Sequence, residues 1–355
     1  MSLFSPLTQR SLTLKNRIVV SPMCQYSADE GVPGQWHFVH LGSRAIGGAA
    51  AVIAEATAVE ARGRISPADT GLWNDAQTEA WAPIAHFVRE AGAVAGVQLA
   101  HAGRKASVAA PWNGNRGLTP EQGGWEPVAP SPLAFADGYI EPQALAIADL
   151  DAVVRAFSDA ARRALDAGFE LVEIHGAHGY LLHQFLSPLS NRRDDAYGGS
   201  FDNRVRLLRR VIAAIRTEWP ERLPLWLRIS ATDWTQDGAG GWDLEQSCAL
   251  AEAIRDDGVD LIDVSTGGAL AKAKIPVGPG FQVPFAAEIR RRCGAATGAV
   301  GMITEARQAD EIVRSGQADV VLLARELLRD PYWPRRAAAE LGVKIDAPLQ
   351  YQRAW

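Results

Sequence analysis

Short runs of apolar residues alternate along the whole chain with longer stretches in which polar and apolar positions share the faces of a helix. A run of four to eight apolar residues predicts a buried strand, and the amphipathic stretch that follows predicts a helix. The predicted strands are Ile18–Met23, Ala51–Ala56, Val94–Ala100, Glu170–His175, Leu223–Ile229, Asp260–Ser265, Gly298–Gly301 and Asp319–Ala324. The predicted helices are Trp36–Ile46, Gln77–Ala91, Leu150–Ala167, Asp202–Glu218, Leu244–Asp257, Pro284–Arg292, Glu305–Ser315 and Glu326–Leu341.

Eight strand-then-helix units favour a (β/α)8 barrel, an α/β fold in which residues 1–355 form one domain. Glycine turns such as Ala167-Gly168-Phe169 join a helix to the next strand, as a helix C-cap requires. A doubly wound open sheet would give the same alternation. However, no GxGxxG motif follows an early strand, which argues against the usual dinucleotide-binding form of that fold.

One connection, residues 101–148, is far longer than the others and has little helical periodicity. Long connections without regular structure in compact domains are usually functional. This one follows the third strand, so we expect it to cap the end of the barrel where the strands finish. Its tryptophans Trp112 and Trp125 either cover the site or pack on the surface.

Composition and charge exclude several classes of protein. The chain has 355 residues, 47% of them hydrophobic and 22% charged, with a net charge of −5. This is typical of a globular protein without a nucleic-acid arm, and no apolar run approaches the roughly 20 residues that span a bilayer. The first residues lack a secretory pattern, so we expect the cytoplasm. The three cysteines Cys24, Cys248 and Cys293 lie too far apart for a disulfide framework or a cysteine-bound cluster.

The most informative segment runs from Glu170 to Tyr180, where a strand-like stretch ends in His175-Gly-Ala-His178-Gly-Tyr180. Active sites of barrels form at the carboxyl ends of the strands, and imidazoles with a phenol can bind a polarised oxygen and supply a proton. The other polar or small residues expected at strand ends are Cys24, Tyr26, Ala56, Gln98, His101, Arg228, Ser265, Gly267, Gly301, Ala324 and Arg325. We expect strand alternation to point the carboxylates Glu55 and Glu173 away from these groups.

Three interpretations of this set remain open. His175, His178 and His183 are a possible zinc-ligand set for a barrel hydrolase. Alternatively, the histidines mark only a polar helix start. Small residues at Gly301 and Ala324 followed by Arg325 resemble the phosphate site that barrels build after strands seven and eight. With Gln98 and Arg228 deeper inside, such a site fits flavin mononucleotide (FMN) across the mouth of the barrel.

Several motifs, in order along essentially the whole chain, resemble the Old Yellow Enzyme family of flavin-dependent ene-reductases. The motifs are Ser21-Pro-Met-Cys-Gln-Tyr26, Gln98-Leu-Ala-His-Ala-Gly-Arg-Lys105, His175-x-x-His178-Gly-Tyr180, Ser187-Pro-Leu-Ser-Asn191, Asp195-x-Tyr-Gly-Gly-Ser200 and Arg325-Glu-Leu-Leu-Arg-Asp-Pro331. Cys24 and the tail Gln350-Tyr-Gln-Arg-Ala-Trp355 resemble the thermophilic-like subgroup, which includes xenobiotic reductases and bacterial NADPH dehydrogenases.

The resemblance implies a role for each matching residue. Non-covalent FMN would be bound by Ser21, Pro22, Met23, Cys24, Ala56, Gln98, Arg228, Gly301, Ala324 and Arg325. Most relatives have glycine where this chain has Ala324, so we expect the phosphate to shift slightly. His175 and His178 would bind the carbonyl oxygen of an activated alkene, Tyr26 would contact the substrate, and Tyr180 would donate a proton. NADPH, or NADH, would deliver hydride and leave, and no metal is implied.

The tail, residues 347–355, combines tyrosine, arginine and tryptophan, which are enriched at interface hot spots. In the resembling subgroup the arginine equivalent to Arg353 reaches the active site of a neighbouring subunit. We therefore expect a homodimer or a dimer of dimers in which Arg353 binds substrate.

Overall fold

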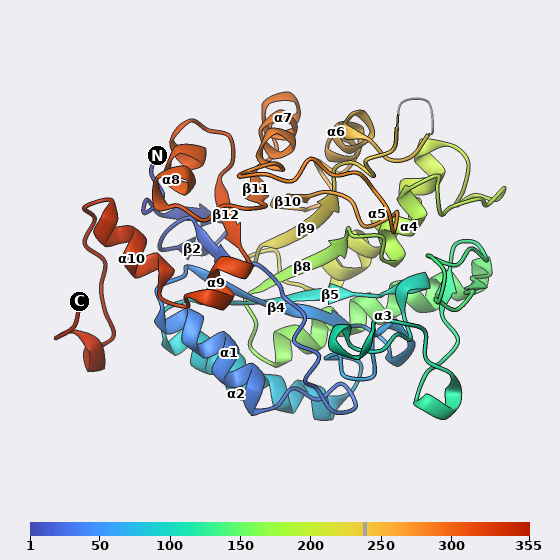
Figure 1. Ribbon diagram of the computed structural model, residues 1–355, viewed down its shortest axis with the longest axis horizontal. Coiled ribbons are helices and arrows are strands. Elements are labelled where there is room, and N and C mark those ends of the chain that lie inside the picture. The colour runs from blue at the N-terminus through green and yellow to red at the C-terminus, as the bar shows by residue number, and fades with distance from the viewer. Residues whose placement is uncertain (237–239) are drawn as a thin grey trace.

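The computed structural model of the protein describes residues 1–236 and 240–355. Eight parallel strands close into a barrel in the order β10-β11-β12-β3-β4-β5-β8-β9, which confirms the predicted barrel. Its strands cross the centre of Figure 1 with helices around them. They are β3 (Ile18–Val20), β4 (Ala51–Ala58), β5 (Val94–Ala100), β8 (Leu171–Gly176), β9 (Leu225–Ser230), β10 (Leu261–Ser265), β11 (Thr297–Val300) and β12 (Val320–Leu323).

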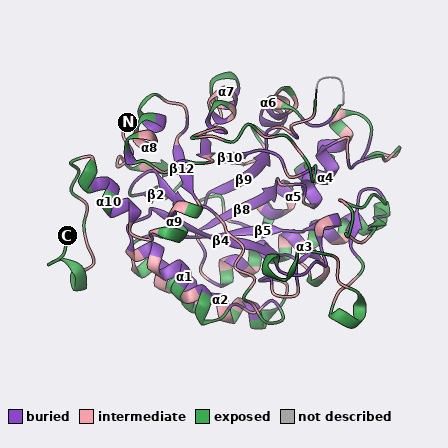
Figure 2. Ribbon diagram, in the orientation of Figure 1, coloured by how far each residue is buried: buried purple, intermediate pink, exposed green. Residues whose placement is uncertain are grey.

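Helices surround the barrel because each has one apolar stripe to bury against the strands. Figure 2 shows buried residues through the strands and on the inner faces of the helices. The helices are α1 (Gln35–Ile46), α2 (Asp75–Glu90), α3 (Ile147–Asp166), α4 (Leu181–Leu186), α5 (Phe201–Glu218), α6 (Leu244–Ala253), α7 (Val283–Cys293), α8 (Ala306–Arg314), α9 (Arg325–Arg329) and α10 (Trp333–Glu340). None of the described helices is long and apolar enough to cross a membrane.

A hairpin that the sequence pattern did not predict lies before the barrel. Its strands are β1 (Leu7–Gln9) and β2 (Leu12–Leu14), which pair antiparallel. Leu14 packs in one buried cluster with barrel residues that include Val19 and Trp226. The Trp226 indole also donates to Gln9 Oε1 at 2.7 Å. The hairpin therefore closes the amino end of the barrel and leaves the carboxyl end for the site.

Two helical segments differ from the prediction. The single helix expected over Glu326–Leu341 is two helices, α9 and α10. Pro331 lies between them, and proline removes a helical hydrogen bond and clashes with the preceding turn. Helix α4 was not predicted, because all six of its residues are buried and it has no polar face that would reveal a helical period.

The long connection follows β5 and has little regular structure, as expected. It contains three short 3-10 turns and a small parallel pair of strands, β6 (Val128–Ala129) and β7 (Gln143–Ala144). The Arg193 guanidinium donates to the carbonyl oxygens of Pro130 (3.1 Å) and Leu145 (2.6 Å). These bonds fix both ends of the β6–β7 segment to the barrel.

Candidate active site

The end of β8 brings three of the predicted site residues together. The ring of His175 lies 5.0 Å from that of His178 and 5.0 Å from that of Tyr180, edge to face in both cases. His178 has a φ of 58°, a backbone conformation that is uncommon for residues other than glycine. The Ser230 hydroxyl accepts from the His178 amide at 2.9 Å, and the Lys105 ammonium donates to the His178 carbonyl at 2.9 Å. The turn is therefore held from both sides.

A hydrogen bond indicates which ring nitrogen of His175 carries the proton. The Ala177 amide donates to Nδ1 of His175 at 3.3 Å, so the ring proton of His175 lies on Nε2. The Nε2 atom of His178 lies 2.8 Å from the Ser265 hydroxyl. Gln282 Oε1, the other neighbour of that hydroxyl, already accepts from Thr266 at 2.7 Å. The Ser265 hydroxyl can also donate to Gln282 Oε1, at 3.3 Å, and an amide oxygen can accept two hydrogen bonds. The single proton of Ser265 can go to Gln282 or to His178, so this contact does not assign the tautomer of His178.

Both imidazoles are neutral. Burial, then the positive charges nearby, holds the pKa of His175 and of His178 well below the ordinary value. Arg228 is one of these charges in both cases. A neutral imidazole donates one hydrogen bond and adds no charge, so the pair can polarise an oxygen without acting as acids.

Aromatic residues and a thiol form the wall beside the histidines. Cys24, Tyr26, Trp125, Tyr139 and Tyr180 pack around one small apolar cluster. Burial raises the pKa of Tyr180 well above 10, and it also raises the pKa of the Cys24 thiol. Tyr180 therefore keeps its proton, and Cys24 is a thiol rather than a thiolate.

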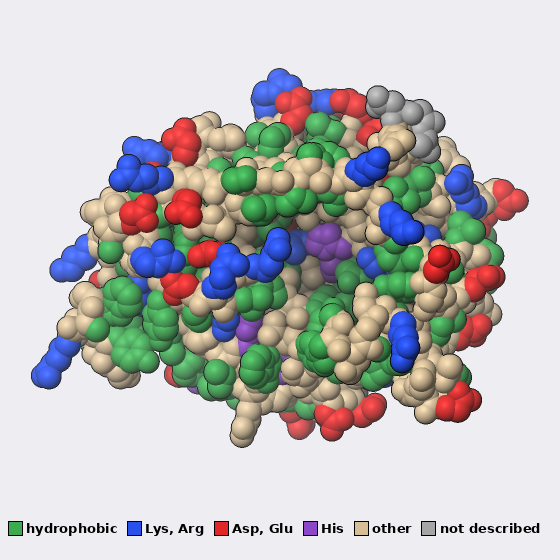
Figure 3. Space-filling model, in the orientation of Figure 1, with side chains coloured by type: hydrophobic (Ala, Val, Ile, Leu, Met, Phe, Trp, Pro, Cys, Tyr) green, Lys and Arg blue, Asp and Glu red, His purple; other side chains and the backbone are tan. Residues whose placement is uncertain are grey.

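Both tryptophans of the long connection lie at this wall. Trp112 meets Tyr26 edge to face at 5.7 Å, although 67% of Trp112 is exposed. Trp125 donates from its indole to the Arg62 carbonyl at 2.8 Å. The connection therefore covers the carboxyl end of the barrel. Figure 3 shows the resulting hollow, with a histidine side chain inside it and hydrophobic and basic side chains around it.

Lys105 is a site residue to which the sequence analysis gave no role. Its ammonium donates to the carbonyls of His178 and Gly268, at 2.9 and 3.2 Å, and lies over the Tyr180 ring, 5.1 Å from its centre. Burial lowers the pKa of Lys105 to about 8. The run Gln98–Lys105 contained this residue, but only the folded chain shows that it reaches the β8 turn.

A polar layer crosses the inside of the barrel below the histidines. Gln98 Nε2 donates to Glu173 at 2.7 Å, and the Arg228 guanidinium contacts Asp263 at 2.5 Å and the Ser21 hydroxyl at 2.8 Å. The expectation that Glu173 points away from the other candidates was wrong. Gln98 and Glu173 are paired in register on β5 and β8, so their side chains emerge on the same face of the sheet.

Glu55 supports another part of the site. The register of β4 against β5 shifts between Ala54 and Ala56, and such a bulge re-aims the side chain. The Glu55 carboxylate accepts from the Gln25 amide at 2.8 Å and lies 3.2 Å from Nε2 of His37. It therefore ties the segment after β3, which carries Pro22, Met23 and Cys24, to helix α1.

The residues expected to bind a phosphate lie at the ends of β11 and β12. Gly301 has a φ of 116°, and an added Cβ would lie 2.7 Å from Gln282 Nε2, so only glycine fits there. Ala324 follows β12 and is the N-cap residue of α9, which begins with the exposed Arg325. Ala56 is buried on β4. β3, β4, β11 and β12 are neighbours in the barrel, so these residues share one side of its mouth.

His183 does not join the other histidines. Its Nδ1 accepts from the Gly179 amide at 2.8 Å, and its Nε2 lies 3.1 Å from Asp233. Within residues 1–236 and 240–355, no group of three or more histidines, cysteines or carboxylates is placed to hold a metal ion. The described residues therefore give the zinc hydrolase alternative no ligand set.

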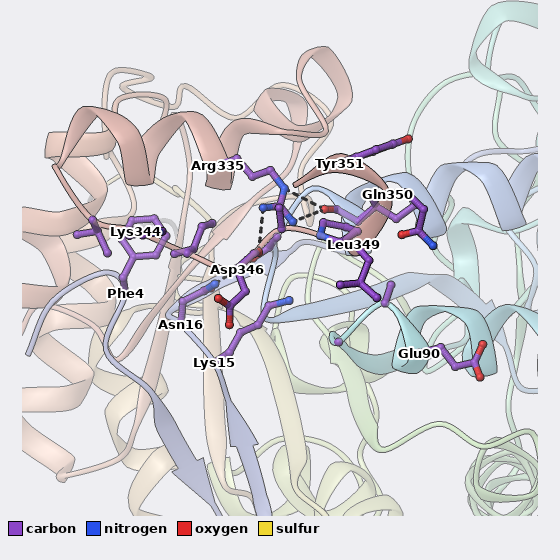
Figure 4. A pocket seen from close by; sticks show the side chains of 18 of the residues that line it. Phe4, Lys15, Asn16, Glu90, Arg335, Lys344, Asp346, Leu349, Gln350 and Tyr351 are labelled. Carbon is purple, nitrogen blue, oxygen red and sulfur yellow. Dashed lines mark hydrogen bonds between the residues drawn. The ribbon is translucent and has the colours of Figure 1, made fainter. Parts of the chain in front are cut away.

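The tail lies at the other end of the barrel. Residues 343–351 line a cavity with Lys15, Gly48 and Gly92, which precede β3, β4 and β5 (Figure 4). Trp355 stacks on Tyr332 with 6.3 Å between ring centres. The structure therefore does not bring Arg353 to the histidines of its own chain.

Comparison with known proteins agrees with this geometry. The sequence signature of the NADH:flavin oxidoreductase / NADH oxidase family matches residues 2–343. An NADPH dehydrogenase from Geobacillus sp. (strain WCH70) is 50% identical over 355 residues, 99% of this chain and 98% of the relative.

Two solved structures share the fold. The Old Yellow Enzyme homologue from Zymomonas mobilis has a TM-score of 0.80 and 28% identity, over 98% of this chain and 95% of that one. Morphinone reductase in complex with tetrahydroNAD has a TM-score of 0.78 and 28% identity, over 98% and 93%. The chain belongs to the NADH:flavin oxidoreductase / NADH oxidase family and is an FMN-dependent oxidoreductase of the Old Yellow Enzyme type.

Proposed function

We propose that the protein is an NADPH-dependent ene-reductase, which reduces the C=C bond of α,β-unsaturated carbonyl compounds. The observation that supports this best is the cluster at the end of β8: two neutral imidazoles beside a phenol that keeps its proton. This cluster suits a reaction in which negative charge develops on an oxygen and a carbon then takes a proton.

The residues present fit FMN. Gln98 and Arg228 would bind the pyrimidine edge of its ring, beside the segment Ser21–Cys24 and Ala56. Gly301, Ala324 and the exposed Arg325 would hold its phosphate. Gly301 supports this placement, because its φ of 116° favours glycine, and a backbone without a side chain lets a phosphate approach closely. When bound, FMN would accept hydride from a nicotinamide and pass it to the alkene.

His175 and His178 would act on the carbonyl oxygen of the substrate. Hydride addition to the β-carbon moves electrons toward that oxygen, where Nε2–H of His175 and the ring N–H of His178 would both donate. Such donors stabilise the transition state more than the ground state, and loss of one typically costs about 10²–10³ in rate. Tyr26 would contact the substrate from the facing wall.

Tyr180 would then donate its proton to the α-carbon. Its ring lies 5.0 Å from that of His175, so the imidazoles and the phenol could act on the carbonyl oxygen and the α-carbon of one small enone. NADPH would occupy the same hollow before the alkene. This order of binding suits a chain that lacks a GxGxxG dinucleotide motif.

The experiment follows the two half-reactions of the purified protein without oxygen. We expect bound FMN that heat denaturation releases, bleaching of its absorbance by NADPH, and recovery of the absorbance on addition of 2-cyclohexenone. A protein that binds no FMN would contradict the cofactor assignment. A reduced flavin that 2-cyclohexenone does not reoxidise would contradict the ene-reductase assignment alone.

A further inference from the structure

The polar layer inside the barrel holds more acidic than basic groups. Glu173 and Asp263 are 0% exposed and Arg228 is 4% exposed. If all three were ionised, the layer would carry a net charge of −1 away from the solvent. An uncompensated buried charge of this kind is costly, and proteins usually avoid it by protonation.

Distances show which carboxylate balances the guanidinium. Arg228 Nε lies 2.5 Å from Asp263 Oδ2 but 3.8 Å from Glu173 Oε1. The same Glu173 oxygen accepts a hydrogen bond from Gln98 Nε2 at 2.7 Å. Asp263 is therefore the counterion of Arg228, and Glu173 has no cation of its own at close range.

Two buried oxygens in the layer have no hydrogen-bond donor. They are Glu173 Oε2 and Asp263 Oδ1, one on each carboxyl group. The two carboxyl groups lie within hydrogen-bonding range of one another. A single proton between them would supply the missing donor, and nothing else in this arrangement does so. Burial, then repulsion from Asp263, raises the pKa of Glu173 well above its usual range.

On the strands that pack against Glu173, no ionisable group other than Asp263 is placed to share a proton with it. From β5 it meets the Gln98 amide, from β9 Arg228 and from β10 Asp263. On β8 itself His175 follows two residues later, and it is neutral. Burial lowers the pKa of Arg228, but Asp263 and Glu173 outweigh burial and raise it, so this guanidinium keeps its charge.

We propose that Glu173 is a positioning residue of the FMN site that works in its protonated form, sharing one proton with Asp263 and orienting the amide of Gln98. The proposal rests on the placement of the flavin above Gln98 and Arg228. It gives a role to a buried carboxyl group that the proposed chemistry does not otherwise use.

Two consequences follow for the cofactor. Glu173 occupies Nε2 of Gln98, so Oε1 is the amide atom left to accept from the pyrimidine N–H of FMN. A hydride carries two electrons and one proton, so its transfer leaves one extra negative charge on the flavin. A neutral Glu173 adds no repulsion against that charge, whereas an ionised one would. The shared proton stays in the layer throughout.

Infrared spectroscopy of the FMN-bound protein and of Glu173→Gln, Asp263→Asn and Asp69→Asn tests the proposal. We expect the C=O stretching band of one protonated carboxyl group at pH 7, and we expect Glu173→Gln to abolish it. Asp263→Asn should abolish it too, because Glu173 would then ionise as the counterion of Arg228. Asp69, outside the layer, is a buried carboxyl group whose pKa burial raises to about 7, so it adds a band of its own at pH 7. The wild-type layer, Glu173→Gln and Asp263→Asn are therefore compared in the Asp69→Asn background, in which only the band of the layer should remain.

A band that survives in Glu173→Gln would overturn the proposal, and so would a band that survives in Asp263→Asn. The midpoint potential of FMN provides a second readout if Asp263→Asn does not fold. It should be the same in Glu173→Gln as in the wild type, since the amide is also neutral. A clearly higher potential in Glu173→Gln would show that Glu173 is ionised. Neither readout needs alkene turnover, so failure here is distinct from failure of the ene-reductase assignment.

Discussion

The chemistry at the residue scale depends on which atoms hold protons. Tyr180 and both histidines lie in a buried cluster that favours their uncharged forms. The uncharged phenol of Tyr180 keeps its proton, and each uncharged imidazole has one N–H group that can donate a hydrogen bond. The hydrogen bond from the Ala177 amide to Nδ1 leaves Nε2 of His175 as the nitrogen that donates. Substrate activation here therefore depends on orientation more than on charge.

Tyr180→Phe should separate the two half-reactions. We expect reoxidation of the reduced flavin by 2-cyclohexenone to slow by about 10²–10⁴-fold, the usual cost of losing a general acid. Flavin reduction by NADPH should stay near the wild-type rate, because that step needs no proton from the phenol. Stopped-flow absorbance without oxygen measures both. An unchanged reoxidation rate would mean that another group donates the proton.

Cys24→Ser tests whether the thiol beside the flavin tunes it. The thiol is protonated and packs beside Tyr26 and Tyr180, so it is not placed to act as a thiolate nucleophile. We expect the variant to stay active with a shifted flavin midpoint potential. Complete loss of activity at an unchanged potential would contradict this role.

Lys105→Met should reveal the cost of the buried ammonium. The pKa of Lys105 is about 8 in the folded protein, against about 10.4 for an unfolded lysine. The unfolded chain therefore binds more protons between these values, so wild-type stability rises with pH there relative to the variant. The measurement is urea unfolding of both proteins at pH 7.5 and at pH 10.5. The free energy of unfolding of the wild type minus that of the variant should be roughly 3 kcal/mol larger at pH 10.5 than at pH 7.5. If this difference in the free energy of unfolding is the same at both pH values, the lowered pKa of Lys105 is contradicted.

At the scale of elements, the long connection contributes to the aromatic wall beside the histidines. Trp125 is held by its bond to the Arg62 carbonyl and by the Arg64 guanidinium, 4.9 Å from its ring centre. Trp125→Ala should raise the KM for 2-cyclohexenone about tenfold, since an apolar pocket contact is typically worth 1–3 kcal/mol. Trp112→Ala is the matched control, because that side chain is mostly exposed and should matter less. Equal KM values for both variants would refute a capping role.

The sequence predicted the barrel strands well because buried parallel strands give continuous apolar runs, such as Val94–Ala100 on β5. It also predicted that His175 and Arg228 lie near the carboxyl ends of their strands, β8 and β9. It did not predict the Glu173–Asp263 contact or the reach of Lys105, since both depend on pairing between segments far apart in the chain. The hairpin β1–β2 was too short for a periodic pattern.

At the scale of the whole molecule, the tail raises the question of assembly. Leu349 is 80% exposed and Trp355 is 52% exposed, which is unusual for large apolar side chains near one another. Tyr332 and Arg335 contact Trp355 and hold the tail against α10. We propose that the tail packs against a second subunit and brings Arg353 to that subunit's site.

Deletion of Gln350–Trp355 should weaken the dimer and raise the KM for alkenes while FMN stays bound. Arg353→Ala is the companion variant, since it should raise KM and leave the oligomeric state unchanged. Light scattering and steady-state kinetics measure the two properties. If the truncated protein keeps both the wild-type mass and the wild-type KM, the shared site is refuted.

The decisive measurement is the product formed from 2-cyclohexenone and NADPH in D2O. Delivery of hydride to the β-carbon and a solvent-derived proton from Tyr180 to the α-carbon should give cyclohexanone with one deuterium at C2, above the exchange seen with cyclohexanone and oxidised enzyme. NMR and mass spectrometry distinguish the alternatives. Formation of 2-cyclohexen-1-ol would contradict alkene reduction. Cyclohexanone without deuterium at C2 would contradict delivery of a solvent-derived proton to the α-carbon.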